Sequence, residues 1–239
     1  MSTMLSVRDR CGKKGKPSIN VGHKYLTMNC GPIIVTNKVD AADHYEVKFV
    51  RTGTVKVVRG SQITDGTVRD PYAPLLCGIA YTGNIKTKGK YKPYYSVWHD
   101  MINRCYNKKD KRYTSYKDVT VCKRWLCFEN FYEDANDLEG FDDDLIFDGI
   151  LNLDKDYTQS GKESKEYSPK TCIWLDKFMN NRLRNGCSID YKAISPKGKV
   201  YIDHNPAVFA EQHDLKRKAI IDCLSGTRDD YHGWTFQYV

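Results

Sequence analysis

Residues 193–224 read AISPKGKVYIDHNPAVFAEQHDLKRKAIIDCL, and this stretch decides the fold of the C-terminal part of the chain. Residues 193–201 form a strand–turn–strand pattern with proline and glycine in the turn positions. Asn205 is expected to cap a helix that has Pro206 at its first position. The pair at 213–214 makes a short break, so this helix is expected to be short.

A second helix is expected from Leu215 to a stop at residues 225–226, where serine and glycine follow the apolar positions. Lys216, Arg217 and Lys218 lie at its start, which is where the recognition helix of a helix-turn-helix meets bases and phosphates. We predict that these three cations bind DNA. The alternative is a small helical hairpin with a purely structural role.

The charge of the chain is unevenly distributed. The 239 residues carry a formal net charge of +8, but residues 1–93 hold 16 basic and 6 acidic residues. Residues 94–185 hold 15 and 17, and residues 186–239 hold 7 of each. A locally basic module favours a polyanion partner, most often nucleic acid, because phosphate neutralisation releases counterions. The alternative is a lysine-rich surface that only keeps the protein soluble.

Composition excludes two classes of protein. No run of eighteen apolar residues exists, so a membrane span is not expected. The 17 Tyr, 8 Phe and 4 Trp are too many large rings for a disordered chain. Nine cysteines without a secretory pattern near the N-terminus predict reduced thiols and a cytoplasmic location. No CxxC pairs occur at zinc-ligand spacing, so structural zinc is not expected.

The N-terminal third is predicted to be a small antiparallel β module. Residues 33–35, 45–50 and 54–59 are short and β-branched, with a compact hairpin turn at 51–53. Cations on these strands are predicted to face DNA, and the alternative is a solvated basic face. A lysine-rich stretch that reads as a linker follows, and its cations are assigned to DNA as well. The predicted DNA-binding residues of this third are Lys48, Lys56, Arg59, Lys86, Lys88, Lys90 and Lys92.

The middle of the chain is predicted to be mixed. Residues 95–106 place their apolar positions on one helical face, and a strand is expected at 119–122. Aromatic residues then recur at helical spacing over 125–138, which is typical of a buried core. Between Glu129 and Asp156 there are eleven carboxylates and one cation. Such runs are usually solvated, and this one is expected at the surface.

The C-terminal motifs resemble the helix-turn-helix found behind phage HNH homing endonucleases, a nuclease-associated modular DNA-binding domain. The resemblance covers residues 189–238. Several motifs agree in order, at residues 194–198, 210–215, 223–226 and 233–236.

The middle segment resembles the HNH-like core of phage proteins of the same family. Residues 98–107 match its W-x-x-M-x-x-R-C-Y-N opening, and later blocks match at 121–125, 153–156 and 167–174. The N-terminal module is similar, more weakly, to the basic β domain that accompanies such cores, and to the three-stranded DNA-binding sheet of plant ethylene-response factors.

The resemblance implies an α+β, multi-domain protein that binds double-stranded DNA. The expected parts are a basic β module at 1–83, a lysine-rich linker at 84–93, a ββα-metal (HNH-like) core at 94–186, and a helix-turn-helix module with short strands at 187–239.

An active core of this family holds one divalent metal, Mg²⁺ or Mn²⁺, with an Asp and an Asn, and a His activates the attacking water. By the resemblance, the Asp position falls on Asp154, the His position on Lys155 and the second-strand Asn position on Thr171. Asn180 or Asn181 supplies the later Asn. The carboxylate and amide oxygens of such a set suit a hard cation.

Two of the three expected catalytic groups are therefore changed. A protonated lysine at 155 cannot accept a proton, although it can stabilise phosphate charge. Threonine at 171 is a poorer metal ligand than an amide carbonyl. Asp154 and Asp156 are the predicted metal ligands, and His99 in the first helix is an alternative group that approaches from elsewhere.

Three functional hypotheses remain open at this point. The first is a metal-dependent DNA endonuclease or nickase of the homing type. The second is a DNA-binding protein whose HNH-like core has lost its chemistry, acting as a regulator, anti-defence factor or packing protein. The third is an RNA or protein binder, for which abundant tyrosine is the only support.

Overall fold

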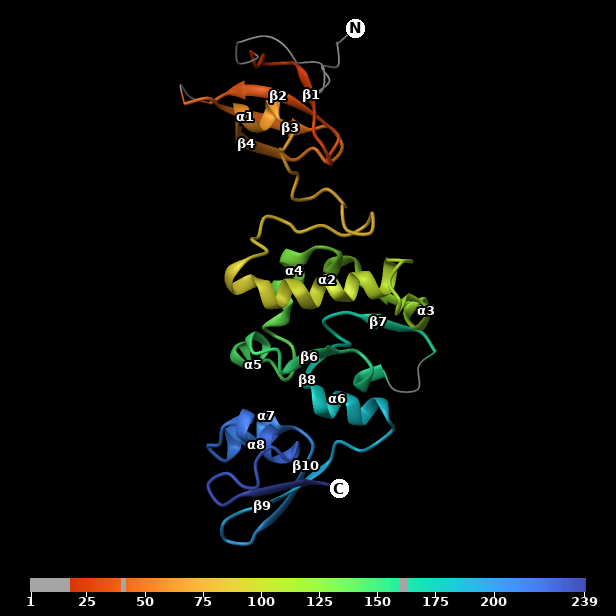
Figure 1. The fold of residues 1–239 in the computed structure, drawn as a ribbon, viewed down its shortest axis with the longest axis vertical. Helices are drawn as coiled ribbons and strands as arrows, with labels where there is room; N and C mark the ends of the chain where they lie inside the picture. The colour runs from red at the N-terminus through yellow and green to blue at the C-terminus, as the bar shows by residue number, and fades with distance from the viewer. Residues whose placement is uncertain (1–17, 40–41, 160–162) are drawn as a thin grey trace. The chain divides into compact units, whose positions relative to one another are not determined.

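The computed structural model describes residues 18–39, 42–159 and 163–239, and it is an α+β protein (Figure 1). The chain divides into two compact units. The first unit ends at Ile85 and also takes in Leu126–Glu129, whereas the second comprises Lys86–Trp125 and Asn130–Val239.

The first unit is built on a four-stranded antiparallel sheet in the order β1-β2-β3-β4. The predicted strands and the hairpin turn are confirmed: Gly53 adopts a φ of 76° and its N–H donates to Phe49 O at 2.9 Å. Alternate residues such as Val35 and Val47 are fully buried, as the period of two in a strand requires. The elements are β1 (Lys24–Leu26), β2 (Pro32–Lys38), β3 (His44–Phe49), β4 (Val55–Arg59) and the short helix α1 (Gly60–Thr64).

The opposite face of this sheet is open. Cross-strand partners lie on the same face, and the register joins Lys24 to Ile34, Ile34 to Lys48 and Lys48 to Val55 in one row. Arg59 lies on this face too, because it pairs with His44. We call the surface of these residues the open face of the sheet.

A later segment completes the first unit. Tyr81 pairs with the chain at Leu126–Glu129: its N–H donates to Leu126 O, and Phe128 N–H donates to Tyr81 O, both at 2.9 Å. Glu129 accepts a further hydrogen bond from Asn84 N–H at 3.0 Å. Segments that are far apart in the sequence therefore belong to the same compact unit.

The second unit contains a long helix and two small sheets. Trp98 on the helix is buried, and its Nε1 donates to Trp125 O at 2.7 Å. Trp174 Nε1 donates likewise to Ala135 O at 2.9 Å, so the aromatic positions form core, as predicted. The elements are η1 (Gly89–Tyr91), α2 (Lys92–Tyr106), α3 (Tyr113–Tyr116), β5 (Val119–Val121), η2 (Lys123–Leu126), α4 (Phe128–Ala135), α5 (Asp143–Phe147), β6 (Leu151–Asp154), η3 (Tyr157–Gln159), β7 (Lys165–Tyr167), β8 (Ile173–Asp176) and α6 (Lys177–Arg184).

The two small sheets place the later part of this region. β5 and β7 pair in parallel, and β6 and β8 pair antiparallel with Asp154 opposite Ile173. α6 follows β8 directly, because Asp176 caps it by accepting hydrogen bonds from the N–H groups of Phe178 and Met179. β6 and β8 therefore form a strand pair, with η3 and β7 between them in the chain, and α6 follows β8.

The C-terminal part has the two short helices that the sequence predicts. Asn205 caps the first by accepting from the N–H groups of Ala207 and Val208, and Asp214 breaks the chain with a φ of 53°. Phe209 and Ile220 are buried beneath a three-stranded sheet. The elements are β9 (Tyr191–Ile194), β10 (Val200–Asp203), α7 (Pro206–Gln212), α8 (Arg217–Leu224) and β11 (Thr235–Tyr238), with the strand order β10-β9-β11.

Two expectations for the middle segment need correction. α2 begins at Lys92 rather than at residue 95, because Pro93 lies in its first turn, where its fixed φ favours helix initiation. The carboxylate run is not only a solvated surface. Asp142 caps α5 by accepting from Leu145 N–H at 3.0 Å, and Asp143 accepts from the Tyr94 hydroxyl at 2.5 Å.

Among the residues with a described conformation, no helix combines the length and apolar character that a bilayer crossing requires.

Candidate active site

A polar cavity of about 230 Å³ lies within the second unit. This volume is several times the ~30 Å³ that a water molecule takes up in the liquid. Its wall brings together four of the predicted site residues, Asp154, Asp156, Asn180 and Asn181. The lining side chains are Val97, Asp100 and Arg104 from α2, Tyr116 from α3, Asn152, Leu153 and Asp154 from β6, Asp156, Tyr167 from β7, and Asn180 and Asn181 from α6.

Asp154 is the last residue of β6 and is buried, with 5% of its surface exposed. Its Oδ1 accepts hydrogen bonds from the N–H groups of Asp156 at 2.9 Å and Tyr157 at 2.8 Å, which fixes the turn into η3. Burial raises the pKa of this carboxyl, and the two backbone hydrogen bonds oppose that rise. Within the described ranges, no hydrogen bond occupies the second oxygen, Oδ2.

Lys155 is buried and ion-paired. Its Nζ donates to both oxygens of Asp156, at 2.8 and 2.9 Å, and Lys165 Nζ donates to Asp156 Oδ1 at 2.6 Å. Burial acts to raise the pKa of Asp156, but the hydrogen bonds from the two lysines outweigh it and lower the pKa. The ammonium group of Lys155 is thus held in an ion pair with Asp156, and an ammonium group has no lone pair to accept a proton.

Two tyrosine rings of the cavity wall each face two cations. The Arg104 guanidinium lies 5.2 Å from the Tyr116 ring centroid and 5.7 Å from that of Tyr167. Lys155 Nζ lies 5.0 and 5.4 Å from the same two rings. Such contacts stabilise buried cations through the negative face of the ring. The cavity therefore combines carboxylates, amides and a cation held on aromatic rings.

Thr171 is not among the residues that line the cavity. Its hydroxyl donates to Glu166 O at 2.7 Å and accepts from Ser168 N–H at 3.1 Å. These contacts hold the turn before β8, so the hydroxyl is already used. The role of Thr171 as a metal ligand stays a prediction without support from this geometry.

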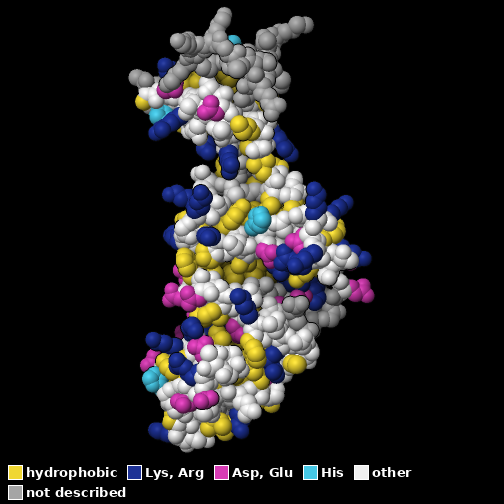
Figure 2. All heavy atoms as spheres, in the orientation of Figure 1, with side chains coloured by type: hydrophobic (Ala, Val, Ile, Leu, Met, Phe, Trp, Pro, Cys, Tyr) yellow, Lys and Arg dark blue, Asp and Glu magenta, His cyan; other side chains and the backbone are white. Residues whose placement is uncertain are grey.

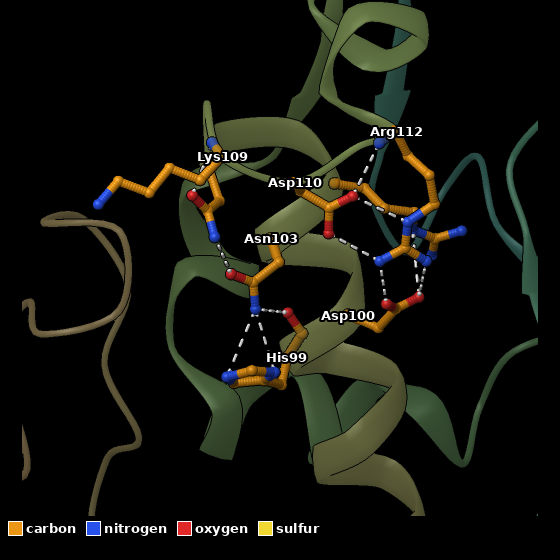
Figure 3. Close-up of polar contacts among 8 residues, drawn as sticks. His99, Asp100, Asn103, Lys109, Asp110 and Arg112 are labelled. Carbon is orange, nitrogen blue, oxygen red and sulfur yellow. Dashed lines mark hydrogen bonds and ion pairs between the residues drawn. The ribbon is translucent and has the colours of Figure 1, made fainter.

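His99 is not among the residues that line the cavity, and it points to a different side of α2 from the cavity-lining Asp100 (Figure 3). The side-chain amide of Asn103 donates to His99 O at 2.8 Å and lies 3.1 Å from the ring Nδ1 (Figure 3). The structure therefore does not bring His99 to Asp154, and its catalytic role also stays a prediction.

Asp100 is held by a second arginine. Arg112 donates from Nη2 to Asp100 Oδ1 at 2.6 Å and from Nη1 to Asp100 Oδ2 at 3.1 Å. The same guanidinium binds Asp110, at 2.8 Å from Nη2 to Oδ2, so it lies between the two carboxylates (Figure 3). Arg104 approaches Asp100 less closely, with its Nε 3.4 Å from Asp100 Oδ2. This Nε makes no hydrogen bond with a described group.

The donor set of the cavity fits a hard divalent cation. Carboxylate and amide oxygens are the ligands that Mg²⁺ and Mn²⁺ prefer, and Asp154, Asn180 and Asn181 supply them. Asp156 is less suited, because two ammonium groups already neutralise it. Within residues 18–39, 42–159 and 163–239, no three His, Cys, Asp or Glu side chains cluster to hold a metal alone. A metal here would therefore depend on the amides of α6.

The cations predicted to bind DNA divide by sheet face in the first unit. Lys48 and Arg59 are exposed on the open face, as predicted. Lys56 is different: it pairs with the buried Val47, so it lies on the opposite face of the sheet, where its Nζ donates to Arg69 O at 3.3 Å. The three cations therefore do not share one face of the sheet, and their role in DNA binding stays a prediction.

The remaining predicted cations lie in the second unit. Lys86, Lys88, Lys90 and Lys92 are all exposed. Figure 2 shows Lys and Arg side chains spread over the visible surface among acidic ones rather than gathered in one patch.

The cations at the start of α8 do not behave alike. Lys216 and Lys218 are exposed, whereas Arg217 donates from Nη1 to Gly140 O at 2.6 Å. Burial lowers the pKa of Arg217, and Asp142 and Asp176 oppose that change. Arg217 therefore fastens α8 to the loop before α5, and nothing in this contact points to DNA.

Comparisons with known proteins give one match. No protein-family model and no curated protein match the chain. One solved structure aligns, that of the HNH homing endonuclease I-HmuI, described in terms of DNA binding and cleavage by that enzyme. The alignment covers 90% of this chain and 87% of that chain, at 12% identity and a TM-score of 0.21. A superposition this loose carries no argument about function.

Sequence reasoning assigned no role to several residues of the cavity wall, chiefly Arg104, Tyr116 and Asn152. One signal was available for Asn152, because it lies two residues before Asp154 on a strand and so faces the same side. Arg104 and Tyr116 reach the cavity from helices about 40 to 50 residues earlier in the chain. No local pattern in the sequence predicts that approach.

Proposed function

We propose that this protein binds double-stranded DNA and cleaves or nicks it with the help of a divalent metal, as an HNH-like endonuclease. The observation that carries the proposal is the polar cavity in which Asp154 meets Asn180 and Asn181. The strand–strand–helix order of β6, β8 and α6 supports it, since this is the arrangement that an HNH-like core implies.

The reaction is hydrolysis of a phosphodiester. Water adds to phosphorus, one P–O bond to a sugar oxygen breaks, and the leaving oxygen takes up a proton, so the products are a phosphate monoester and an alcohol. A bound Mg²⁺ or Mn²⁺ supplies charge neutralisation at the phosphate and the leaving oxygen. Asp154 is the ligand we assign with most support, and Asn180 or Asn181 completes the set.

The test uses the purified full chain with duplex DNA and either Mg²⁺ or Mn²⁺. We expect strand breaks that disappear when the metal is chelated. Asp154→Asn should lower the cleavage rate by at least ~100-fold, while its oxygen keeps accepting the two backbone hydrogen bonds of the turn. Asp144→Asn is the matched control, because Asp144 is an exposed carboxylate away from the cavity. Equal rates for Asp154→Asn and the wild type would contradict the proposal.

A second candidate is a DNA-binding protein whose core has lost its chemistry. It is favoured by Lys155, which is held as an ion pair with Asp156, and by Thr171, whose hydroxyl is used within its own turn. Neither residue then offers the proton acceptor or the metal ligand that an active core needs. This candidate predicts salt-dependent DNA binding with no strand breaks in either metal.

A further inference from the structure

Arg104 is a cation of the cavity wall that lacks a full partner. Its side chain is 18% exposed, and its buried Nε makes no hydrogen bond with any described group. A buried donor without a partner costs free energy, more so when it is charged. The residues around it explain why it has none.

Two of the three carboxylates that line the cavity, Asp100 and Asp156, are already paired with other cations. Both oxygens of Asp100 receive hydrogen bonds from Arg112, in the paired geometry that carboxylates and guanidinium groups favour. Arg104 is left with the 3.4 Å approach to Asp100 Oδ2. Asp156, another carboxylate of the cavity wall, is paired with Lys155 and Lys165. The charge of Arg104 therefore remains available to an anion that enters the cavity.

The tyrosine rings hold the guanidinium in place. Tyr116 and Tyr167 each contact both Arg104 and Lys155, from α3 and β7 respectively. Lys155 is neutralised by Asp156, whereas Arg104 is not neutralised in the same way. The planar guanidinium is also the group that matches phosphate oxygens with two parallel donors.

We propose that Arg104 is the phosphate-binding residue of this cavity, and that it receives a backbone phosphate of the DNA beside Asp154. The inference rests on the proposed function, since it names the group that recognises the substrate phosphate in the same site. Asp100 and Arg112 are positioning residues in this scheme, because the ion pair between them keeps Asp100 from pairing fully with Arg104.

The first experiment titrates inorganic phosphate into the metal-free full-length protein and follows arginine Nε–H signals by NMR. We expect the Arg104 signal to move in a saturable manner, whereas the Arg112 signal stays in place. Arg104→Lys removes the signal and so assigns it. A wild-type Arg104 signal that does not respond to phosphate would overturn the inference.

The second experiment measures the rise in melting temperature that phosphate produces, because a ligand of the folded state stabilises it. Arg104→Lys keeps a cation against the tyrosine rings but loses the paired donors, so we expect at least ~10-fold weaker phosphate binding. Lys197→Gln is the control, since it removes an exposed cation from the turn between β9 and β10, away from the cavity, and should bind phosphate as the wild type does. Equal affinity of Arg104→Lys and the wild type would also refute the assignment.

These results separate the inference from the proposed function. Asp154→Asn should abolish cleavage while Arg104 still responds to phosphate. If the wild type makes no strand breaks but Arg104 binds phosphate, the endonuclease proposal fails and the phosphate site stands. If the wild type cleaves DNA but Arg104 ignores phosphate, the endonuclease stands and the phosphate site fails.

Discussion

At the scale of single residues, Lys155 shows how a change of side chain alters its neighbours. The ammonium group is buried, and Asp156 is its carboxylate partner. The two residues are adjacent in sequence, so the pair forms within one turn. The sequence resemblance predicts a proton acceptor at this position, and the structure has one end of an ion pair there.

Asp156→Asn is therefore expected to destabilise the protein by about 1–2 kcal/mol, because it leaves the buried Lys155 ammonium without its charged partner. Because the Asp156 side chain is 39% exposed, the figure is below the ~3–5 kcal/mol that the loss of one partner of a fully buried pair costs. The urea-unfolding midpoint measures the loss, with Asp144→Asn as the control at an exposed carboxylate. An unchanged midpoint for Asp156→Asn would contradict this account, because it would show that Lys155 does not need the Asp156 carboxylate for stability.

Asp110 gives the clearest dependence of stability on pH. Hydrogen bonds from the Arg112 side chain, and then from its backbone N–H, lower the pKa of Asp110 from 3.8 to about 2. A carboxyl with a lowered pKa stabilises the folded state when ionised, so its contribution is present above pH ~4 and is lost as pH falls towards 2. Unfolding midpoints between pH 5 and 2.5 should therefore fall less steeply for Asp110→Asn than for the wild type. Parallel curves would show that the ion pair with Arg112 contributes nothing.

At the scale of elements, the sequence predicted most boundaries that depend on local chemistry. The cap at Asn205, the break at Asp214 and the stop after Leu224 all follow from side chains that act within a few residues. No strand was predicted at β11, because its partner β9 lies about 40 residues earlier in the chain. The parallel pairing of β5 with β7 depends on long-range contacts in the same way.

The candidate site divides along the same line. Asp154, Asp156, Asn180 and Asn181 were predicted from motifs, and the fold does bring them to one cavity. Arg104 and its aromatic neighbours were not assigned, because α2, α3, β6 and β7 come together around this cavity only in the folded chain. Periodicity in one helix shows which face is buried, but not which strand lies beneath it.

Gly140 tests the packing of the loop before α5. It adopts a φ of +75°, and a Cβ there would lie 2.3 Å from Trp174 O. Gly140→Ala should therefore cost about 3 kcal/mol or more, since backbone must move to remove the clash. Gly149→Ala is the matched control, with a φ of +67° and nothing within 4 Å. It should cost only the ~1 kcal/mol of an unfavourable backbone conformation, and equal melting temperatures for the two variants would refute this account.

At the scale of the whole molecule, the uneven charge of the sequence predicts where DNA binding is most sensitive to salt. The open face of the sheet carries Lys48 and Arg59, and Lys56 lies on the other face. The two faces provide an internal comparison within one small domain.

Lys48→Gln and Arg59→Gln are each expected to reduce the slope of log affinity against log salt by about 1, because each removes one phosphate contact. Lys56→Gln should leave the slope unchanged. Binding titrations on one duplex at several salt concentrations make the comparison. If Lys56→Gln reduces the slope as much as Lys48→Gln, the open face is not the surface that meets DNA.

The pairing of Tyr81 with Leu126–Glu129 limits how this protein can be taken apart or recombined. A gene fragment that stops at Ile85 would encode the sheet without the strand-like partner that receives Tyr81, and a fragment that starts at Lys86 would carry that partner with nothing to bind. Exchange of the N-terminal module between related genes is therefore expected to give a folded protein only when residues 1–85 and Leu126–Glu129 are exchanged together. The segment Leu126–Glu129 is short, but without it residues 1–85 do not form the whole of the first unit.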